Sequence, residues 1–121
     1  NYIRKGLEDV QDKFILPEKC PNSDPSWFGF LITCKDGVDK NKVVQFLENN
    51  GVQTRMLFGG NMTKQPCFTE MKKENKGYRI IGELKQTDRI MNNTFWIGVY
   101  PGMTDEKLDY MIEKLKESVK E

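Results

Sequence analysis

The clearest hydrophobic pattern in this chain is a set of three short runs typical of β-strands. Residues 26–34, SWFGFLITC, include five aromatic or β-branched residues, which favours a strand. Residues 94–100, TFWIGVY, have a similar composition, whereas residues 52–58, VQTRMLF, are predicted as a strand from their alternation. Glycine, proline and asparagine separate these runs from their neighbours and mark turns. The pattern therefore predicts a small sheet of three strands.

Alternation along each run assigns its side chains to two faces of the sheet. The first run divides into Phe28, Phe30, Ile32 and Cys34 on one face and Trp27, Gly29, Leu31 and Thr33 on the other. The second run divides into Val52, Thr54, Met56 and Phe58 on one face and Gln53, Arg55 and Leu57 on the other. Trp27, Arg55 and Trp96 are expected together on one face. Because this mixture is unusual for a solvent surface, we expect the face to dock against something larger.

Three longer segments have the helical spacing of apolar residues. Residues 2–14 predict an amphipathic helix, and because no capping residue precedes it, we expect it to be the end of a longer helix. Asp39 is a plausible N-cap for a helix through Asn49, and Thr104 for the last helix. The expected fold is a small α+β sandwich, with a three-stranded sheet and its helices on one face.

The remaining segments carry weaker signals. Residues 17–25 contain three prolines and predict a linker or surface crossover. Residues 62–77 are polar and predict a helical turn plus a loop, whereas residues 78–84 fit a short strand or a helix equally well. Thr87 or Asp88 is expected to cap a short helix through Met91.

Charge and composition restrict the classes of partner and site. The net charge is +1, so no global field attracts nucleic acid or an anionic membrane, and no apolar run approaches the roughly 20 residues that span a bilayer. The chain has no histidine, and Cys20, Cys34 and Cys67 are too widely spaced for a metal motif. We expect a cytoplasmic protein with no metal of its own, whose cysteines are small buried hydrophobes. Its start at Asn1 suggests a fragment or a processed product.

The stretch from Gly51 to Pro66, GVQTRMLFGGNMTKQP, is the candidate binding segment. It runs from a strand into a Gly-Gly loop, which could expose backbone N–H groups to a polar ligand. The candidate substrate-binding residues are Arg55, Phe58, Gly59, Gly60 and Asn61. No complete catalytic constellation can be assembled from this chain, so we assign no catalytic, cofactor-binding or metal-binding residue.

Each candidate also has a purely structural interpretation. Arg55 could form a salt bridge, the two glycines could make a plain turn, and Asn61 could be a turn residue. Phe58 and Trp27 could stack on a sugar or nucleotide, or could be part of an interface core. Further along the chain, Asn92 and Asn93 fit a helix cap or a cleft lining, and Lys72 and Lys73 fit solvated surface charge.

Three segments resemble the C-terminal small domain of the DegT/DnrJ/EryC1/StrS family of sugar-nucleotide aminotransferases. They are PSWFGFLIT at 25–33, NNGVQTRMLFGGNMTKQP at 49–66 and TDRIMNNTFWIGVYPGMTDEKLDYMIEKL at 87–115. Within the family, they are most similar to the lipopolysaccharide-biosynthesis branch typified by CDP-4-dehydro-6-deoxyglucose 3-dehydratase. Typical aminotransferases of the family carry a histidine near the position of Asn61, and this departure favours the dehydratase.

The resemblance implies the minor domain of a fold type I enzyme dependent on pyridoxal phosphate. Residues 1–16 would end an interdomain helix, 17–25 would be a linker, and 26–121 would form the domain. A larger N-terminal domain would bind pyridoxamine or pyridoxal phosphate and a [2Fe-2S] cluster, and a reductase would supply electrons. The parent enzyme would be a homodimer that dehydrates a sugar nucleotide in deoxysugar and O-antigen biosynthesis. This chain would help to close the substrate cleft and would be inactive alone.

Two alternatives remain open at this stage. The chain could be the minor domain of an ordinary aminotransferase of the family, which a Schiff-base lysine in the larger domain would establish. It could also be a free-standing docking module whose aromatic sheet face recognises a protein partner.

Overall fold

The computed structural model describes residues 2–74 and 77–120, so Asn1, residues 75–76 of the predicted loop and residue 121 lie outside the described residues. An antiparallel sheet with the strand order β1-β2-β4-β3 forms its centre. The strands are β1 (Phe14–Ile15), β2 (Gly29–Cys34), β3 (Thr54–Met56) and β4 (Thr94–Gly98). The predicted runs at 26–34, 52–58 and 94–100 correspond to β2, β3 and β4.

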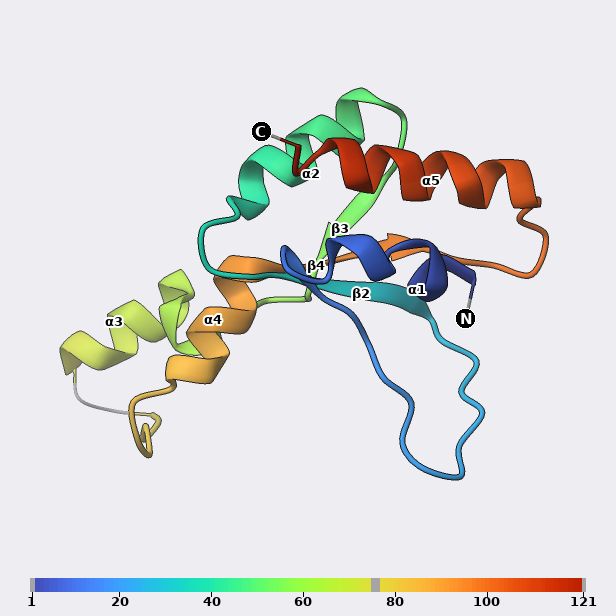
Figure 1. Cartoon of the computed structure of the whole chain (residues 1–121). Helices are drawn as coiled ribbons and strands as arrows, with labels where there is room; N and C mark the ends of the chain where they lie inside the picture. The colour runs from blue at the N-terminus through green and yellow to red at the C-terminus, as the bar shows by residue number, and fades with distance from the viewer. Residues whose placement is uncertain (1, 75–76, 121) are drawn as a thin grey trace.

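Helices surround this sheet unequally. They are α1 (Tyr2–Gly6), α2 (Lys40–Asn49), α3 (Pro66–Glu74), α4 (Lys85–Asn93) and α5 (Asp105–Glu117), with 3₁₀ turns η1 (Glu8–Val10) and η2 (Met62–Lys64). Figure 1 shows α1, α2 and α5 over one face of the sheet. The predicted α+β class, with helices on one face, is therefore confirmed for these three helices.

The core lies between that sheet face and the three helices. Ile32 of β2 lies opposite Phe95 of β4, and both are fully buried. Ile97 lies opposite Thr54 of β3, and these residues are also buried. From the helical side, α5 contributes Leu115 and its neighbours to the same cluster. The register of the sheet thus sends one set of alternating side chains into the core and the other set to the opposite face.

The helix caps predicted at Asp39 and Thr104 are present. The Asp39 carboxylate accepts the N–H groups of Asn41 and Lys42 at 2.8 and 3.4 Å, where α2 starts. The Thr104 hydroxyl accepts the N–H of Lys107 at 3.4 Å at the start of α5. These side chains satisfy backbone donors that have no partner inside the helix.

The predicted helix over residues 2–14 is wrong beyond its first turns. Helix α1 ends at Gly6, and Phe14 belongs to β1, where it lies opposite Cys34. Phe14 is 1% exposed. Burying its ring in the core stabilises the fold more than leaving it on a surface helix would. Within the described residues the sheet consequently has four strands and not the expected three. Residues 1–16 were assigned to an interdomain helix, yet Ile3, Leu7 and Phe14 belong to the core of this domain.

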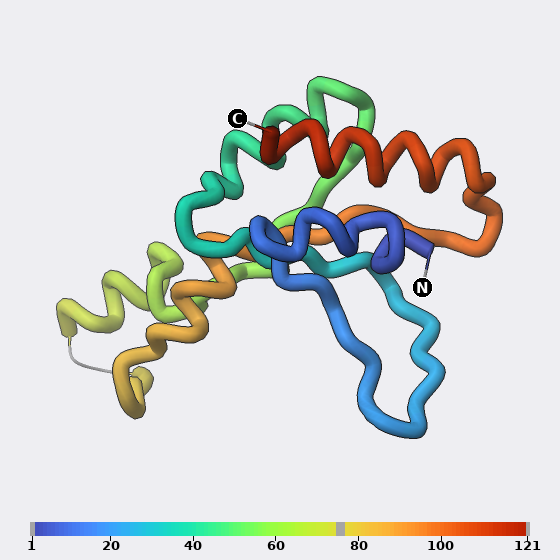
Figure 2. Tube along the Cα trace, viewed as in Figure 1, coloured from blue at the N-terminus to red at the C-terminus, as the bar shows by residue number. Residues whose placement is uncertain are grey.

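The predicted short helix also starts in a different place. Helix α4 begins at Lys85, after Leu84 with φ of 53°, and neither Thr87 nor Asp88 caps it. The preceding segment 78–84, which fitted a strand or a helix, adopts neither. The region of α3 and α4 and the long segment between β1 and β2 both project from the sheet on the side away from α2 and α5 (Figure 2).

A carboxylate joins α2 to β3 and gives a testable pH dependence. Glu48 Oε1 accepts both the hydroxyl and the N–H of Thr54 at 2.6 Å. These hydrogen bonds, and the weaker attraction of Arg55, lower the pKa of Glu48. A carboxylate with a lowered pKa in the folded state stabilises that state above its ordinary pKa, and this contribution is lost as pH falls through the lowered pKa.

We therefore expect Glu48→Gln to destabilise the fold at neutral pH and to matter progressively less in acid. The measurement is the free energy of unfolding in urea between neutral and acidic pH, for the unchanged chain and the variant. Glu8→Gln, at an exposed position, is the control and should show no such convergence. A difference that stayed constant down to the most acidic pH would contradict the expectation.

Candidate functional site

The face of the sheet that α2 and α5 leave uncovered carries Trp96 at its centre. Trp96 lies on β4 between Leu31 of β2 and Arg55 of β3. The rings of Phe28 and Phe58 pack on the indole at centroid distances of 5.3 and 5.0 Å. These two phenylalanines are nevertheless 85% and 79% exposed. We name these five residues the open-face cluster.

The predicted sheet faces of Phe28 and Phe58 are wrong. Strand β2 begins at Gly29, so alternation does not extend back to Phe28. Strand β3 ends at Met56, and the N–H of Phe58 donates to the carbonyl oxygen of Met56 at 2.8 Å in a tight turn. Phe58 has φ of 48°, a conformation that is uncommon for a bulky residue. The turn reverses the expected direction and places the ring on Trp96.

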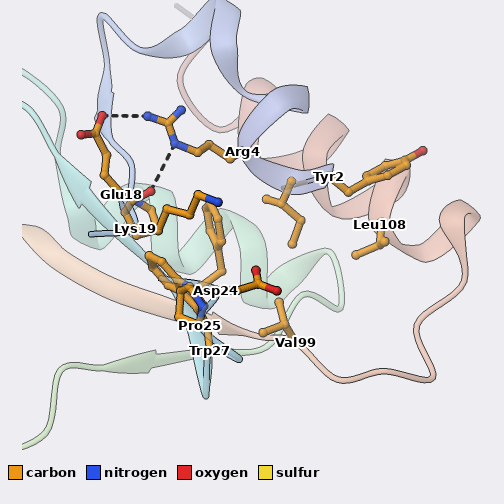
Figure 3. Close-up of a pocket in the computed structure, with 12 residues that line it drawn as sticks. Tyr2, Arg4, Glu18, Lys19, Asp24, Pro25, Trp27, Val99 and Leu108 are labelled. Carbon is orange, nitrogen blue, oxygen red and sulfur yellow. Dashed lines mark hydrogen bonds and ion pairs between the residues drawn. The ribbon is translucent and has the colours of Figure 1, made fainter. Parts of the chain in front are cut away.

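Trp27 does not join the open-face cluster, although its alternation predicted this. It lines a cavity of about 680 Å³ together with Val99 (Figure 3) and Phe30. Both of these residues pack against the core cluster. Trp27 also precedes β2, so the strand does not determine its direction. Beside this cavity, Arg4 donates to Pro17 O and pairs with Glu18 at 2.8 Å.

Arg55 projects from β3 beside Trp96, and its side chain is exposed. Nη1 donates to the carbonyl oxygen of Thr54 at 2.8 Å. When the Gln53 amide is oriented so that its oxygen faces the guanidinium, this oxygen accepts from Nη1 and Nη2 of Arg55 at 3.2 and 2.9 Å. The guanidinium carries five N–H donors and a permanent charge, so it can still bind an anion in this position.

A cavity of about 620 Å³ adjoins Arg55 at the outer edge of β3. Tyr100 and Tyr110 supply aromatic surface to it, while Gln53 and Lys107 supply polar groups. The Tyr110 hydroxyl donates to the carbonyl oxygen of Asn50 at 2.9 Å, which fixes its ring at the cavity wall. The cavity is thus an apolar hollow whose lining also includes the cations Arg55 and Lys107 and the carboxylate of Glu106.

The two glycines of the candidate loop have different roles. Gly60 has φ of 62°, and a Cβ atom there would lie 2.5 Å from Cγ of Met91. Because both the backbone conformation and the contact exclude a side chain, Gly60 allows the loop to approach α4. The carbonyl oxygen of Gly59 accepts from Nε2 of Gln65 at 2.8 Å, so Gly59 is tied to the other end of the loop.

Asn61 is 3% exposed, and its amide is engaged within the chain. Oδ1 accepts the N–H and hydroxyl of Thr63 at 3.1 and 2.7 Å, which makes Asn61 the N-cap of η2. Nδ2 donates to Oδ1 of Asp88 at 2.7 Å. Asp88 in turn pairs with Lys64 at 2.9 Å. A contact between Asn61 and a sugar stays a prediction.

Asp88 was not recognised from the sequence as part of the site. Its partner Asn61 lies 27 residues earlier, and the position of Asp88 near a helix start favoured a capping role. The hydrogen bonds from Lys64 and then Asn61 lower the pKa of Asp88. No local pattern around Asp88 would have distinguished this contact from a cap.

The other sequence candidates have structural surroundings. Asn93 Nδ2 donates to the carbonyl oxygen of Cys34 at 3.1 Å. Lys72 and Lys73 are exposed on the last turn of α3, in agreement with solvated charge. Cys34 is buried as expected, and burial raises its pKa to about 11. Exposure of the other two cysteines, Cys20 and Cys67, contradicts their prediction as buried hydrophobes.

The described residues do not fit a metal or cofactor site. No group of three or more histidine, cysteine, aspartate or glutamate residues in the described ranges could hold a metal ion. Burial lowers the pKa of Lys40, but its Nζ donates to the carbonyl oxygen of Met91 at 2.8 Å and does not line either cavity. No step of cofactor chemistry is therefore assigned to these residues. Separately, none of the helices in residues 2–74 and 77–120 has the length and hydropathy of a membrane span.

Solved structures of similar fold include both dehydratases and aminotransferases. Escherichia coli GDP-4-keto-6-deoxy-D-mannose-3-dehydratase superposes with a TM-score of 0.77 at 22% identity, over 94% of this chain and 28% of that one. A PLP-dependent aminotransferase from Bacillus cereus gives a TM-score of 0.75 at 17% identity, over 95% of this chain and 29% of that one. At these identities the similarity establishes the fold alone, and this fold is the one expected from the sequence.

Two curated proteins are similar at the level of sequence. The lipopolysaccharide biosynthesis protein RfbH of Salmonella typhimurium is 49% identical over 97% of this chain and 26% of its own length. The dTDP-4-dehydro-2,6-dideoxy-D-glucose 3-dehydratase of Saccharopolyspora spinosa is 43% identical over 97% of this chain and 24% of its own length. This chain thus spans about a quarter of the relatives that it matches.

The family-level comparison covers nearly every element described above. The model of the DegT/DnrJ/EryC1/StrS aminotransferase family matches residues 1–116, from α1 to the last turn of α5. Together with the two relatives, this match confirms the resemblance first indicated by the segments at 25–33, 49–66 and 87–115. The chain belongs to the DegT/DnrJ/EryC1/StrS aminotransferase family.

Proposed function

We propose that this chain is the minor domain of a sugar-nucleotide 3-dehydratase and that its open sheet face helps to close the substrate cleft. The single observation that carries this proposal is the open-face cluster. Two phenylalanines that are mostly exposed pack on Trp96 beside an arginine. Clustered exposed aromatic rings mark an interaction surface more often than a free solvent face.

The occupant proposed for this face is a larger domain of the same protein. The matched relatives are about four times as long as this chain, which leaves ample chain for such a domain. The segment between β1 and β2 and the α3–α4 region project on this side of the sheet (Figure 1), where they would flank a docked domain. In this proposal residues 26–121 form the minor domain, residues 17–25 form a surface crossover, and residues 1–16 lead from the larger domain while also packing in this core.

The choice of a dehydratase rests on the relatives. One of the two is named a sugar 3-dehydratase, and the other is named for lipopolysaccharide biosynthesis. The proposed substrate is a nucleotide-linked 4-keto-6-deoxy sugar of the CDP-4-dehydro-6-deoxyglucose type. Pyridoxamine or pyridoxal phosphate would act as the electron sink that permits loss of the 3-hydroxyl. We place that cofactor, and a [2Fe-2S] cluster served by a reductase, in the larger domain of a cytoplasmic homodimer.

This chain's own contribution is substrate positioning. Arg55 is the proposed partner of a phosphate or sugar oxygen, since a guanidinium can form two parallel hydrogen bonds to such a group. Phe58 is proposed to lie against an apolar face of the substrate. Gly59 would allow the backbone to approach it closely. Gly60 and Asn61 hold the same loop against α4.

The proposal is tested with a chimeric enzyme. The part of the Salmonella relative that matches this chain is replaced by this chain, and dehydration of CDP- and dTDP-linked 4-keto-6-deoxy sugars is measured with cofactor and reductant. We expect the chimera to be active and this chain alone to be inactive under the same conditions. An inactive chimera that is folded and loaded with cofactor would contradict the proposed function.

Within that chimera, Arg55→Ala is expected to lower kcat/KM by roughly 10- to 100-fold, the scale of one hydrogen bond between charged groups. Arg55→Lys should recover only part of the loss, because lysine lacks the planar fork. Arg79→Ala, at another exposed arginine, is the matched control and should leave kcat/KM unchanged. Equal effects at Arg55 and Arg79 would remove Arg55 from the site.

A second candidate is the minor domain of a sugar aminotransferase. The specific observation in its favour is that aminotransferases share this fold at TM-scores similar to those of the dehydratases. The chimera takes its larger domain from the Salmonella relative, so the assay that distinguishes the two reactions uses the intact enzyme from which this chain comes. Transfer of nitrogen from an amino donor to the 4-keto sugar by that enzyme, with the 3-hydroxyl retained, would favour the aminotransferase.

A further inference from the structure

The candidate loop and Trp96 are held by the same helix-strand unit. Helix α4 runs directly into β4, so Met91 of α4 and Trp96 of β4 lie close together in the sequence. The N–H of Asn61 donates to Sδ of Met91 at 3.3 Å, and Gly60 lies against the same side chain. Movement of the loop relative to α4 would therefore move Phe58 relative to Trp96.

Polar contacts, rather than buried apolar surface, hold α4 in place. None of the residues of α4, all of which the structure describes, is buried. Its attachments include Asp88 to Asn61, Asp88 to Lys64, and the carbonyl oxygen of Met91 to Lys40. Among these, only the first contact is made by Asn61, which belongs to the loop carrying Phe58. Asn61 is 3% exposed. A hydrogen bond to a charged group is stronger than a neutral one, and it is strengthened further when one partner is sheltered from water.

We propose that Asp88 is a positioning residue, whose hydrogen bond from Asn61 holds the loop in the conformation that binds substrate. Phe58 needs such support, because its φ of 48° is unfavourable for a bulky side chain and its ring is mostly exposed. The contact with Asp88 fixes Asn61, and the tight turn from Met56 then presents Phe58 to Trp96. Asp88 itself does not touch the substrate. The step from loop position to substrate binding rests on the proposed function.

A reciprocal exchange of the two side chains tests this contact. Asn61→Asp keeps the acceptor that caps η2, because aspartate caps as well as asparagine, but removes the donor to Asp88. Two carboxylates then face one another, which is unfavourable. Adding Asp88→Asn restores a donor, now from residue 88 to residue 61. Asp88→Asn alone keeps an acceptor for the Asn61 amide but removes its charge and the ion pair with Lys64, so its expected effect has the same direction as that of Asn61→Asp and is smaller. Asp36→Asn, on an exposed turn, is the control.

The first readout is the fluorescence of Trp96 in this chain. The chain has two tryptophans, so Trp27→Phe leaves Trp96 as the only one. In this background we expect Asn61→Asp to shift the emission to longer wavelength and to increase quenching by acrylamide, because Phe58 leaves the indole. The exchanged pair should restore both signals. Unchanged fluorescence in folded Asn61→Asp, or failure of the exchange to restore it, would overturn the proposal.

The second readout is the kinetics of the chimera. If only a fraction of molecules has the binding-competent loop, the apparent affinity falls by that fraction. Asn61→Asp is expected to raise KM about tenfold with little change in kcat, the scale of one lost hydrogen bond to a charged group, and the exchange should restore KM. A restored fluorescence signal with KM unaffected throughout would overturn the link to substrate binding. An unmodified chimera that is inactive refutes the proposed function instead, and the fluorescence of the chain still decides the contact between Asn61 and Asp88.

Discussion

Gly60→Ala is expected to destabilise this protein by about 2–4 kcal/mol, from the combined cost of a left-handed alanine and of overpacking. The φ of Gly60 is 62°, and an added Cβ would lie 2.5 Å from Cγ and 3.0 Å from Sδ of Met91. Met91 cannot retreat freely, because its carbonyl oxygen accepts from Lys40 and its sulfur accepts from Asn61. The measurement is the free energy of unfolding in urea.

Gly51→Ala is the matched control for this substitution. Gly51 has a similar φ of 74°. Apart from its two chain neighbours, no described residue has a heavy atom within 4 Å of a Cβ added there. We expect only the conformational cost there, about 1–2 kcal/mol. The difference between the two variants isolates the contact with Met91. Equal destabilisation would show that the loop does not depend on close approach to α4.

Phe95→Ala is expected to have the largest effect on stability, about 3–5 kcal/mol. Phe95 is fully buried on the central strand β4 and lies opposite Ile32 and Met56 on the two neighbouring strands. Removing its ring leaves a cavity that the sheet cannot close without losing its register. Since the free energy of unfolding of a domain is roughly 5–15 kcal/mol, the variant would lose a large part of it. Thermal and urea unfolding both measure this.

Phe28→Ala provides the contrast, because it removes the same ring from the open-face cluster. Phe28 is 85% exposed, and Trp96 is the one aromatic ring of the described residues on which it packs. We expect a cost of at most about 1 kcal/mol, the typical value of one aromatic pair. A loss comparable to that of Phe95→Ala would show that the open-face cluster stabilises this chain rather than serving a partner.

The candidate site could be located from the sequence only in part. The composition of residues 51–66 was sufficient to single out Arg55 and the loop from Phe58 to Asn61. Neither the packing of Phe58 on Trp96 nor the burial of Asn61 against Asp88 could be predicted. The first depends on a turn with positive φ at a non-glycine residue, and the second joins residues from separate elements.

The sequence by itself determined the features whose causes lie within a few residues. The caps Asp39 and Thr104 start α2 and α5, because a side-chain oxygen next to the first turn satisfies its free N–H groups. The β-branched and aromatic composition of residues 94–98 likewise determined β4. Family membership also followed from local motifs, and the match over residues 1–116 confirmed it.

Only the tertiary structure decided features that depend on contacts between distant residues. Residues 2–14 have helical spacing, yet Phe14 becomes a strand residue because pairing with Cys34 buries its ring. Trp27 and Phe28 are adjacent, yet one lines a cavity beside the helices and the other covers Trp96. The physical reason is that pairing and burial stabilise a segment by more than its intrinsic preference does, and their partners are chosen by the fold as a whole.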